Sequence, residues 1–187
     1  LTEMFSRYGE ISGTWFDGAN GGDGWYGGSK EVRKIDRKNY YNFPRAYKLV
    51  DDMQPNCVIF GDGGPGCRWI GNEKGIAGAT NWSLLRKGEV YPGYDKYYEL
   101  TYGHVDGTAW VPGECDVSIR PGWFYHPEED DKVKTVDQLT DLYYRSVGHN
   151  ATLLLNFPVD RNGLIHPTDS LNAVSFHQRV QKELADN

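Results

Sequence analysis

Two carboxylates, Asp17 and Glu73, each stand at the end of a segment whose pattern predicts a buried strand, 10–16 and 68–73 respectively. Barrels of alternating strands and helices keep their chemistry at the C-terminal ends of parallel strands. A pair of carboxylates at such an edge could cleave a glycosidic bond: one attacks the anomeric carbon or activates water, and the other protonates the leaving oxygen.

The spacing and roles of these carboxylates have competing explanations. Neighbouring strands lie about 4.8 Å apart, so the two groups could reach the roughly 5 to 5.5 Å that a double-displacement mechanism requires. Asp17 could instead cap the next turn, because an Asp-Gly pair is common in turns. Glu73 could instead be a salt-bridge partner of Arg68 or Lys74, and Arg68 and Asn72 could tune its charge state.

The elements that must position these residues alternate between helices and short apolar strands. The expected strands are 10–16, 57–61, 68–73, 109–119 and 151–157, the last buried on both faces, and the expected helices include 43–53, 136–147 and 171–184. Helices leading into strands build a parallel sheet, and a closed eight-stranded barrel takes roughly 250 residues. Residues 1–187 are therefore expected to form one α/β domain, the C-terminal part (about five strands) of a (β/α)8 barrel whose N-terminal strands are missing from this chain.

Segment 19–29 is expected to be a long loop on the same edge as Asp17. Segment 74–108 is expected to be a second long loop, whose length indicates either a functional role or regular structure that the sequence does not reveal. Segment 19–29 is almost all Gly, Asn and Asp around Trp25 and Tyr26, and segment 74–108 shows few regular signals. The chain has 6 Trp and 13 Tyr. Rings among polar residues suit stacking on sugar faces, although an aromatic-rich core gives the same composition.

Several other classes of function are disfavoured. A net charge of −6 and a pI near 5.3 argue against a nucleic-acid surface, and the composition is not that of a membrane-spanning chain. The 5 histidines lack metal-ligand spacing, so neither a metal nor a cofactor is expected. Segment 62–66 lacks the Lys-Ser/Thr of a phosphate loop, and no Ser sits in a Gly-x-Ser-x-Gly elbow. The 3 cysteines allow one disulfide and a free thiol, or three thiols.

Four segments, in order and nearly end to end, resemble the family 29 glycoside hydrolases, the α-L-fucosidases. They are 8–21 with Asp17, 68–75 with Glu73, 110–125 and 150–163. The second of them resembles the subgroup that prefers α-1,3/1,4-linked fucose.

The resemblance implies a retaining mechanism in which Asp17 is the nucleophile and Glu73 is the acid/base. Trp15 matches an aromatic residue that lines the fucose pocket. Trp123 is expected to be a platform for the C5-methyl side of fucose, with ordinary packing at the rim as the alternative. Glu114 is expected to bind substrate hydroxyls or the adjoining galactose, and is the reserve candidate for the acid/base.

Arg68 and Trp110, which fall inside the matching segments, complete the expected substrate-binding set. The implied substrate is a fucosylated oligosaccharide of the branched Lewis type. The resemblance also implies N-terminal barrel strands with pocket histidines and a C-terminal β-sandwich elsewhere in the same protein, and a periplasmic, secreted or lysosomal location. The alternatives are an inactive fucose-binding homologue and a barrel glycosidase for another sugar.

Overall fold

The computed structural model describes residues 1–17 and 31–185. The glycine-rich loop expected over 19–29 lies outside the described residues. The chain forms two compact units, here called the first unit and the second unit. The first unit is Leu1–Gly71 with Asn81–Gly113, and the second unit is Asn72–Thr80 with Glu114–Asn187.

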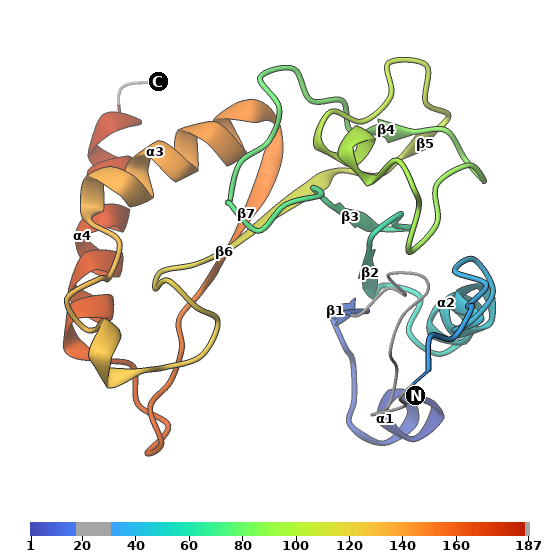
Figure 1. The fold of residues 1–187 in the computed structure, drawn as a ribbon, viewed down its shortest axis with the longest axis horizontal. Coiled ribbons are helices and arrows are strands. Elements are labelled where there is room, and N and C mark those ends of the chain that lie inside the picture. Colours follow the sequence, from blue (N-terminus) through green and yellow to red (C-terminus); the bar gives the residue numbers. More distant parts are fainter. Residues whose placement is uncertain (18–30, 186–187) are drawn as a thin grey trace. The chain divides into compact units, whose positions relative to one another are not determined.

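Five strands follow one another in the sheet order β1-β2-β3-β6-β7 (Figure 1). They are β1 (Gly13–Trp15), β2 (Val58–Gly61), β3 (Cys67–Trp69), β6 (Gly113–Ser118) and β7 (Ala151–Asn156). In the first unit β1 pairs in parallel with β2, placing Trp15 opposite Phe60, and β2 pairs in parallel with β3. Parallel neighbours need a crossover connection, and helix α2 (Phe43–Met53) lies within the one that joins β1 to β2.

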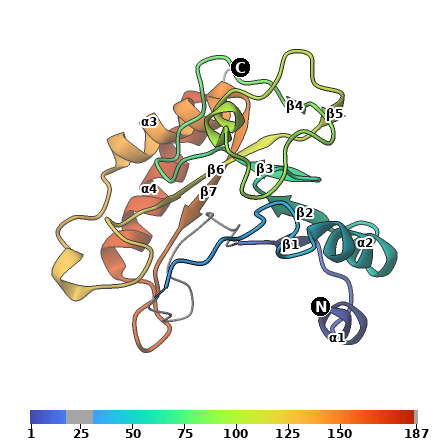
Figure 2. The same cartoon turned by 45° about the vertical axis from the view of Figure 1, so that its right-hand side comes forward.

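Two helices cover the strands of the first unit on one side. Helix α1 (Thr2–Arg7) contacts α2, as Figure 2 shows. Phe5, Val50 and Ile59, one from each helix and one from β2, form a buried core. Helix α2 spans the predicted residues, because a proline in its first turn suits a helix start and its apolar stripe faces this core.

Gln54, the residue after α2, fixes the path of the chain into β1. Its side-chain amide donates to the carbonyl oxygens of Phe5 at 2.7 Å and Gly9 at 3.0 Å. Its side-chain oxygen accepts from the backbone N–H of Ile11 at 3.0 Å. These bonds hold the start of the strand that leads to Asp17.

Segment 74–108 contains more regular structure than its sequence indicates. In the first unit, β4 (Leu84–Leu85) pairs antiparallel with β5 (Ala109–Trp110), and a 3₁₀ turn, η1 (Tyr97–Thr101), lies between them in the chain. Leu85, Leu100 and Val111 form a small buried core. Residues 81–113 are called the excursion below.

The second unit is built on β6 and β7 with two helices, α3 (Val136–Ser146) and α4 (Pro167–Glu183), that pack against each other (Figure 2). Helix α3 begins with a capping box in which Thr135 and Gln138 each accept from the other's backbone N–H. Short 3₁₀ turns lie at η2 (Pro127–Glu129) and η3 (Val147–His149). The buried core consists of Val117, Ile119, Val133, Leu139 and Leu142.

Strand β3 is shorter than predicted. It ends at Trp69, so Glu73 lies four residues beyond the strand rather than at its last position. The carbonyl of Ile70 accepts from the Thr101 hydroxyl at 2.9 Å instead of continuing a ladder. At Gly71 the backbone has φ +89°, and a Cβ there would lie 2.9 Å from the Tyr97 carbonyl oxygen. The chain must therefore turn at Gly71.

Two burial expectations for the second unit are wrong. Each of the six residues of β7 is half-buried or exposed, because Leu153 and Leu155 pack against the core while the alternate side chains keep solvent contact. On α4, Leu171 is 66% and Val174 55% exposed. Both lie on the apolar stripe that the spacing of Leu171, Val174, Val180 and Leu184 predicts for this helix. Phe176 packs against the core instead.

Of the two cysteine arrangements left open, the structure has the three thiols, at Cys57, Cys67 and Cys115. Cys67 and Cys115 are buried, which suits small apolar side chains in a core. Among the described helices, none combines the length and apolar character needed to cross a membrane.

The turn that carries Glu73 requires a glycine two residues later. Gly75 has φ +71°, and a Cβ there would lie 2.8 Å from Cγ1 of Val117 and 3.2 Å from Cδ2 of Leu142. Both of these side chains are buried in the core of the second unit. The turn therefore lies directly on that core.

Replacing Gly75 by alanine is expected to lower the free energy of unfolding by about 2 to 5 kcal/mol. A positive φ costs an L-residue roughly 1 to 2 kcal/mol, and overpacking a core costs about 1 to 3 kcal/mol. Gly163→Ala is the matched control, because Gly163 has φ +76° but nothing within 4 Å of an added Cβ. Denaturant unfolding of the full-length protein measures both variants, and equal losses would contradict the packing argument.

Candidate active site

Asp17 follows β1 on the side of the sheet that faces away from α2. The backbone N–H of Phe16 donates to the Phe60 carbonyl at 3.1 Å, so the pairing with β2 continues past the strand. The Phe16 ring packs edge-on against Tyr47 of α2, with ring centroids 5.6 Å apart. Because side chains alternate along a strand, Trp15 and Asp17 belong to the opposite face.

Trp15 lies two residues before Asp17, on the same face of the strand. Its ring stacks on Phe60 with centroids 4.0 Å apart and an interplanar angle of 9°. Phe60 is buried under this stack, whereas Trp15 remains 44% exposed. A flat, supported and accessible indole next to a carboxylate is suited to the apolar face of a sugar whose anomeric carbon lies over the carboxylate.

Asp62 is a third strand-end carboxylate, which the sequence reasoning treated only as part of a glycine-rich turn. It follows β2 as Asp17 follows β1, and its Oδ2 accepts from the backbone N–H of Gly93 at 3.2 Å. Burial raises the pKa of Asp62, and the negative charge of Asp17 raises it further, while the Gly93 bond acts in the opposite direction. Its place directly after segment 57–61 was the signal that could have identified it.

Glu73 is exposed, and in the second unit its carboxylate is held by an indole. Nε1–H of Trp123 donates to Oε2 of Glu73 at 3.1 Å. Asn72, which was expected to tune the charge of Glu73, instead supports the turn: its side chain donates to the Ile76 carbonyl at 3.0 Å and accepts from Lys74 N–H at 3.0 Å. The turn and the indole together orient the Glu73 carboxylate.

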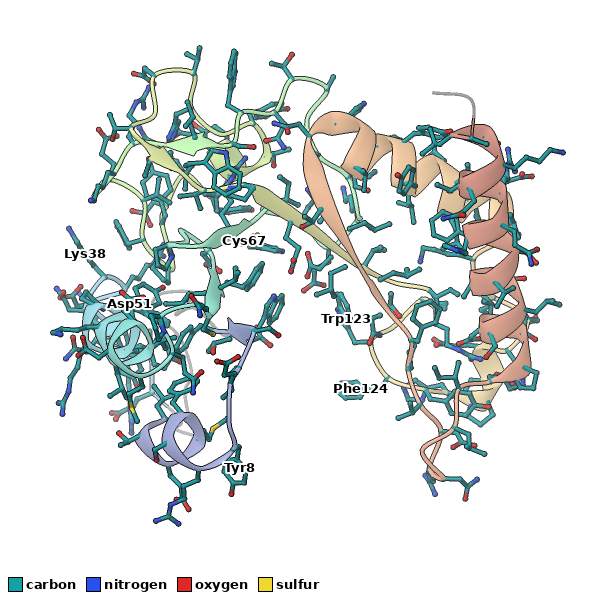
Figure 3. The ribbon with its side chains drawn as sticks, turned by 180° about the vertical axis from the view of Figure 1, so that it is seen from behind. Tyr8, Lys38, Asp51, Cys67, Trp123 and Phe124 are labelled. Carbon is teal, nitrogen blue, oxygen red and sulfur yellow. The ribbon has the colours of Figure 1, made fainter. Side chains whose placement is uncertain are left out.

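The loop that carries Trp123 is anchored on both sides. Figure 3 shows Trp123 and Phe124 on the loop between β6 and α3. The Asn156 amide of β7 donates to the Trp123 carbonyl at 3.0 Å. The buried Arg120 guanidinium lies 4.7 Å from the Tyr125 ring centroid and makes a bidentate pair with buried Asp169 at 2.8 and 2.9 Å. Trp123 is therefore presented by a loop whose base is fixed.

Glu114, the reserve candidate, lies on β6 in the same unit as Glu73. It is half-buried, and the Thr152 hydroxyl of β7 donates to its Oε2 at 3.4 Å. A carboxylate in this position could accept from substrate hydroxyls. Its expected role stays a prediction.

Arg68 has a structural role in the described contacts. Its side chain is 0% exposed and holds the excursion onto β3. Nε of Arg68 donates to the Leu100 carbonyl at 2.9 Å, and Nη1 donates to the Val111 carbonyl. Nη2 donates to the Trp82 carbonyl at 3.0 Å and to the side-chain oxygen of Asn81 at 2.6 Å. Buried guanidinium groups need partners for all their donors, and loop carbonyls supply them here. The expected contact with substrate stays a prediction.

Trp110 differs from Arg68 in being open to solvent. It is 70% exposed at the end of β5, opposite Leu84 of β4. Such an indole has the surface for stacking on a sugar ring. Its expected contact with substrate also stays a prediction.

The structure thus brings the expected residues together in two sets. Asp17 and Trp15 adjoin in the first unit, and Glu73 and Trp123 are bonded in the second. Within the described part of the chain, no group of three or more His, Cys, Asp or Glu side chains could hold a metal ion. The chemistry available to these groups is nucleophilic attack and proton transfer by carboxylates.

Comparison with known proteins identifies similar chains. No protein-family model matches. The whole chain matches Alpha-L-fucosidase 1 of Arabidopsis thaliana, with 43% identity over 192 residues, which is 34% of that protein.

Solved structures agree with this result. A glycoside hydrolase 29 family member from an unknown rumen bacterium has a TM-score of 0.84 and 54% identity, over 97% of this chain and 32% of that chain. A family 29 fucosidase of Ruminococcus gnavus, solved in complex with fucose, has a TM-score of 0.71 and 30% identity, over 92% of this chain and 34% of its own. The expected partial barrel of five strands is confirmed. The chain spans about a third of the length of these relatives, and its sequence and fold both support a relationship to the family 29 α-L-fucosidases.

Proposed function

We propose that this protein is a retaining exo-α-L-fucosidase that releases α-1,3/1,4-linked fucose from branched, Lewis-type oligosaccharides. The observation that carries the proposal is Asp17 at the end of β1 beside the supported Trp15 ring, in a chain 43% identical to a named α-L-fucosidase. The relatives are about three times as long, so the reaction belongs to the full-length protein.

In the first half of the proposed reaction, Asp17 attacks the anomeric carbon and forms an ester with fucose. The bond from that carbon to the leaving oxygen breaks as Glu73 donates its proton to this oxygen. In the second half, ionised Glu73 takes a proton from water, and the oxygen of that water attacks the anomeric carbon. The ester bond breaks, Asp17 leaves as a carboxylate, and fucose is released with its configuration retained.

Trp123 is proposed to serve this cycle through Glu73. Its indole N–H donates to the carboxylate at 3.1 Å, which orients the group that must alternate between acid and base. The ring face of Trp123 remains the proposed platform for the C5-methyl side of fucose. Trp15 is the proposed lining of the fucose pocket beside Asp17, because it is 44% exposed and belongs to the same face of the strand as Asp17.

The linkage preference rests on the excursion and its exposed rings. Trp82, Tyr97, Tyr98, Tyr102 and Trp110 are exposed there. Rings outside the fucose pocket could hold a second branch sugar, and binding energy from such remote contacts can lower the barrier at the reacting bond.

The nucleophile can be tested with Asp17→Ala in the full-length protein. Activity on α-fucosides is expected to fall by more than about a thousandfold, because no group remains to form the ester. Azide should restore part of the rate and give β-fucosyl azide, identified by NMR. Asp51→Ala, on the exposed side of α2 (Figure 3), is the matched control. A wild-type rate in Asp17→Ala would remove Asp17 from the mechanism. Fucose binding without hydrolysis by the unsubstituted protein would instead favour the inactive binding homologue.

Glu73→Ala separates acid catalysis from the other steps. The first step should slow by about 10² to 10⁴ on natural oligosaccharides, because the leaving oxygen needs a proton. Aryl fucosides with acidic leaving groups need little protonation, so the rate at which they form the fucosyl ester should be largely kept. A pre-steady-state burst of the released phenol measures that rate. Glu114→Ala is measured beside it. If Glu73→Ala slows both substrate classes equally and Glu114→Ala discriminates between them, the acid role moves to Glu114.

The linkage preference predicts faster cleavage of branched Lewis-type trisaccharides than of α-1,2-linked fucosyl-galactose. Comparison of kcat/KM for the two substrates measures it, and removing the branching galactose from the trisaccharide should abolish the difference. Equal kcat/KM on the two linkages would refute the subgroup assignment and leave the fucosidase assignment standing.

A further inference from the structure

Asp62 and Asp17 occupy equivalent positions on neighbouring parallel strands. Trp15 lies opposite Phe60 in the register, and the two aspartates are each the second residue beyond that pair. The Phe16–Phe60 backbone bond extends the pairing toward them. Because Trp15 and Phe60 stack on one face, alternation assigns both aspartates to that face.

The contacts of Asp62 fix it in this position. The backbone N–H of Gly93, from the excursion, donates to its Oδ2 at 3.2 Å. The hydroxyl of Tyr47 on α2 is buried and has no hydrogen-bond partner among the described residues. Burial raises the pKa of Tyr47, and so does the negative charge of Asp62, which places the phenol within electrostatic reach of this carboxyl.

The two carboxyl groups also interact with each other. The charge of Asp17 adds to the effect of burial in raising the pKa of Asp62. Two carboxylates that share a site repel each other, so each destabilises the ionised form of its neighbour. In a retaining reaction, one of these charges disappears when Asp17 forms its ester and returns when the ester breaks.

We propose that Asp62 is a positioning residue for the nucleophile, one that keeps Asp17 reactive by placing a second carboxylate beside it. The inference rests on the proposed function, in which Asp17 attacks the anomeric carbon. Repulsion between the two carboxylates is relieved as Asp17 bonds to carbon, which favours the first half-reaction. The same repulsion returns as Asp17 leaves, which slows the second half-reaction.

The two half-reactions therefore respond in opposite directions to loss of the Asp62 charge. Asp62→Asn removes that charge and keeps an oxygen that can accept from Gly93. If Asp62 only supported the fold, its substitution would slow both half-reactions or neither of them. Asp62→Glu keeps the charge and should behave much like the unsubstituted protein.

The test uses the full-length protein and 2-deoxy-2-fluoro-α-L-fucosyl fluoride, from which Asp17 displaces fluoride to form a slowly hydrolysed ester. Intact-mass spectrometry follows formation of the ester and, after the reagent is removed, its hydrolysis; peptide mapping locates it. For Asp62→Asn we expect labelling to be about tenfold slower than in the unsubstituted protein, and hydrolysis of the ester to be several-fold faster. The expected size follows from the effect of one nearby carboxylate on the protonation equilibrium of another, which is about one pKa unit or more.

Controls separate this inference from folding and from the proposed function. Asp51→Asn on α2 should leave both rates unchanged, and thermal unfolding verifies that each variant is folded. If Asp62→Asn slows both steps equally, or changes neither, the positioning role is wrong. If the unsubstituted protein hydrolyses fucosides but is not labelled at Asp17, the assignment of the nucleophile fails instead. If Asp62→Asn does not fold, a tenfold loss of labelling in Asp62→Glu overturns the inference.

Discussion

Irregular loops around a parallel sheet need donors for their buried carbonyl groups, and two buried arginines meet this constraint. In the first unit, Arg68 binds carbonyls that are distant in the chain, among them those of Leu100 and Trp82. In the second unit, Arg120 pairs with Asp169 and lies beneath the loop that carries Trp123. A guanidinium has five donors in a rigid fork, so one side chain can replace much of a hydrogen-bond ladder. Removal of either arginine side chain would leave buried polar groups without hydrogen bonds. The free-energy cost of such unpaired groups is larger than the net contribution of the lost hydrogen bonds to stability.

The surroundings of Asp17, Asp62 and Glu73 differ, and the difference suits the separate roles proposed for these carboxyl groups. Asp17 lies on the same face of its strand as an indole that stacks on a buried phenylalanine. Asp62 follows the next strand, and the charge of Asp17 adds to burial in raising its pKa. Glu73 lies in a turn braced by Asn72 and accepts an indole N–H. In the proposed reaction, a negative charge beside Asp17 would raise the energy of its carboxylate and so favour its attack on the anomeric carbon. A group that must both give and take a proton gains from an oriented carboxylate with open access to solvent.

Elements set by local patterns could be predicted from the sequence, whereas features set by distant contacts could not. Helix α2 was predicted at its observed bounds, because its apolar stripe and Pro55, which follows its end, are local signals. The end of β3 depends on Thr101, 31 residues beyond the carbonyl that it binds. The regular structure of the excursion was not predicted for the same reason, since its order comes from the Arg68 side chain and a three-residue core. Asp62 was missed because its partners, Gly93 and Tyr47, are remote in the chain and its own neighbours are glycines. The role of Asn72 likewise needed the geometry of its turn.

The anchoring of the excursion has a consequence for how such proteins diversify. Its base is held to β3 by Arg68, and Leu85, Leu100 and Val111 make its own small core. The two-residue strands β4 and β5 pair only with each other within the described residues. Insertions or deletions in its outer turns therefore need not disturb the β1–β2 register. The excursion can therefore change in length and sequence during evolution as one peripheral module, while the pairing of β1 with β2 that precedes Asp17 is kept.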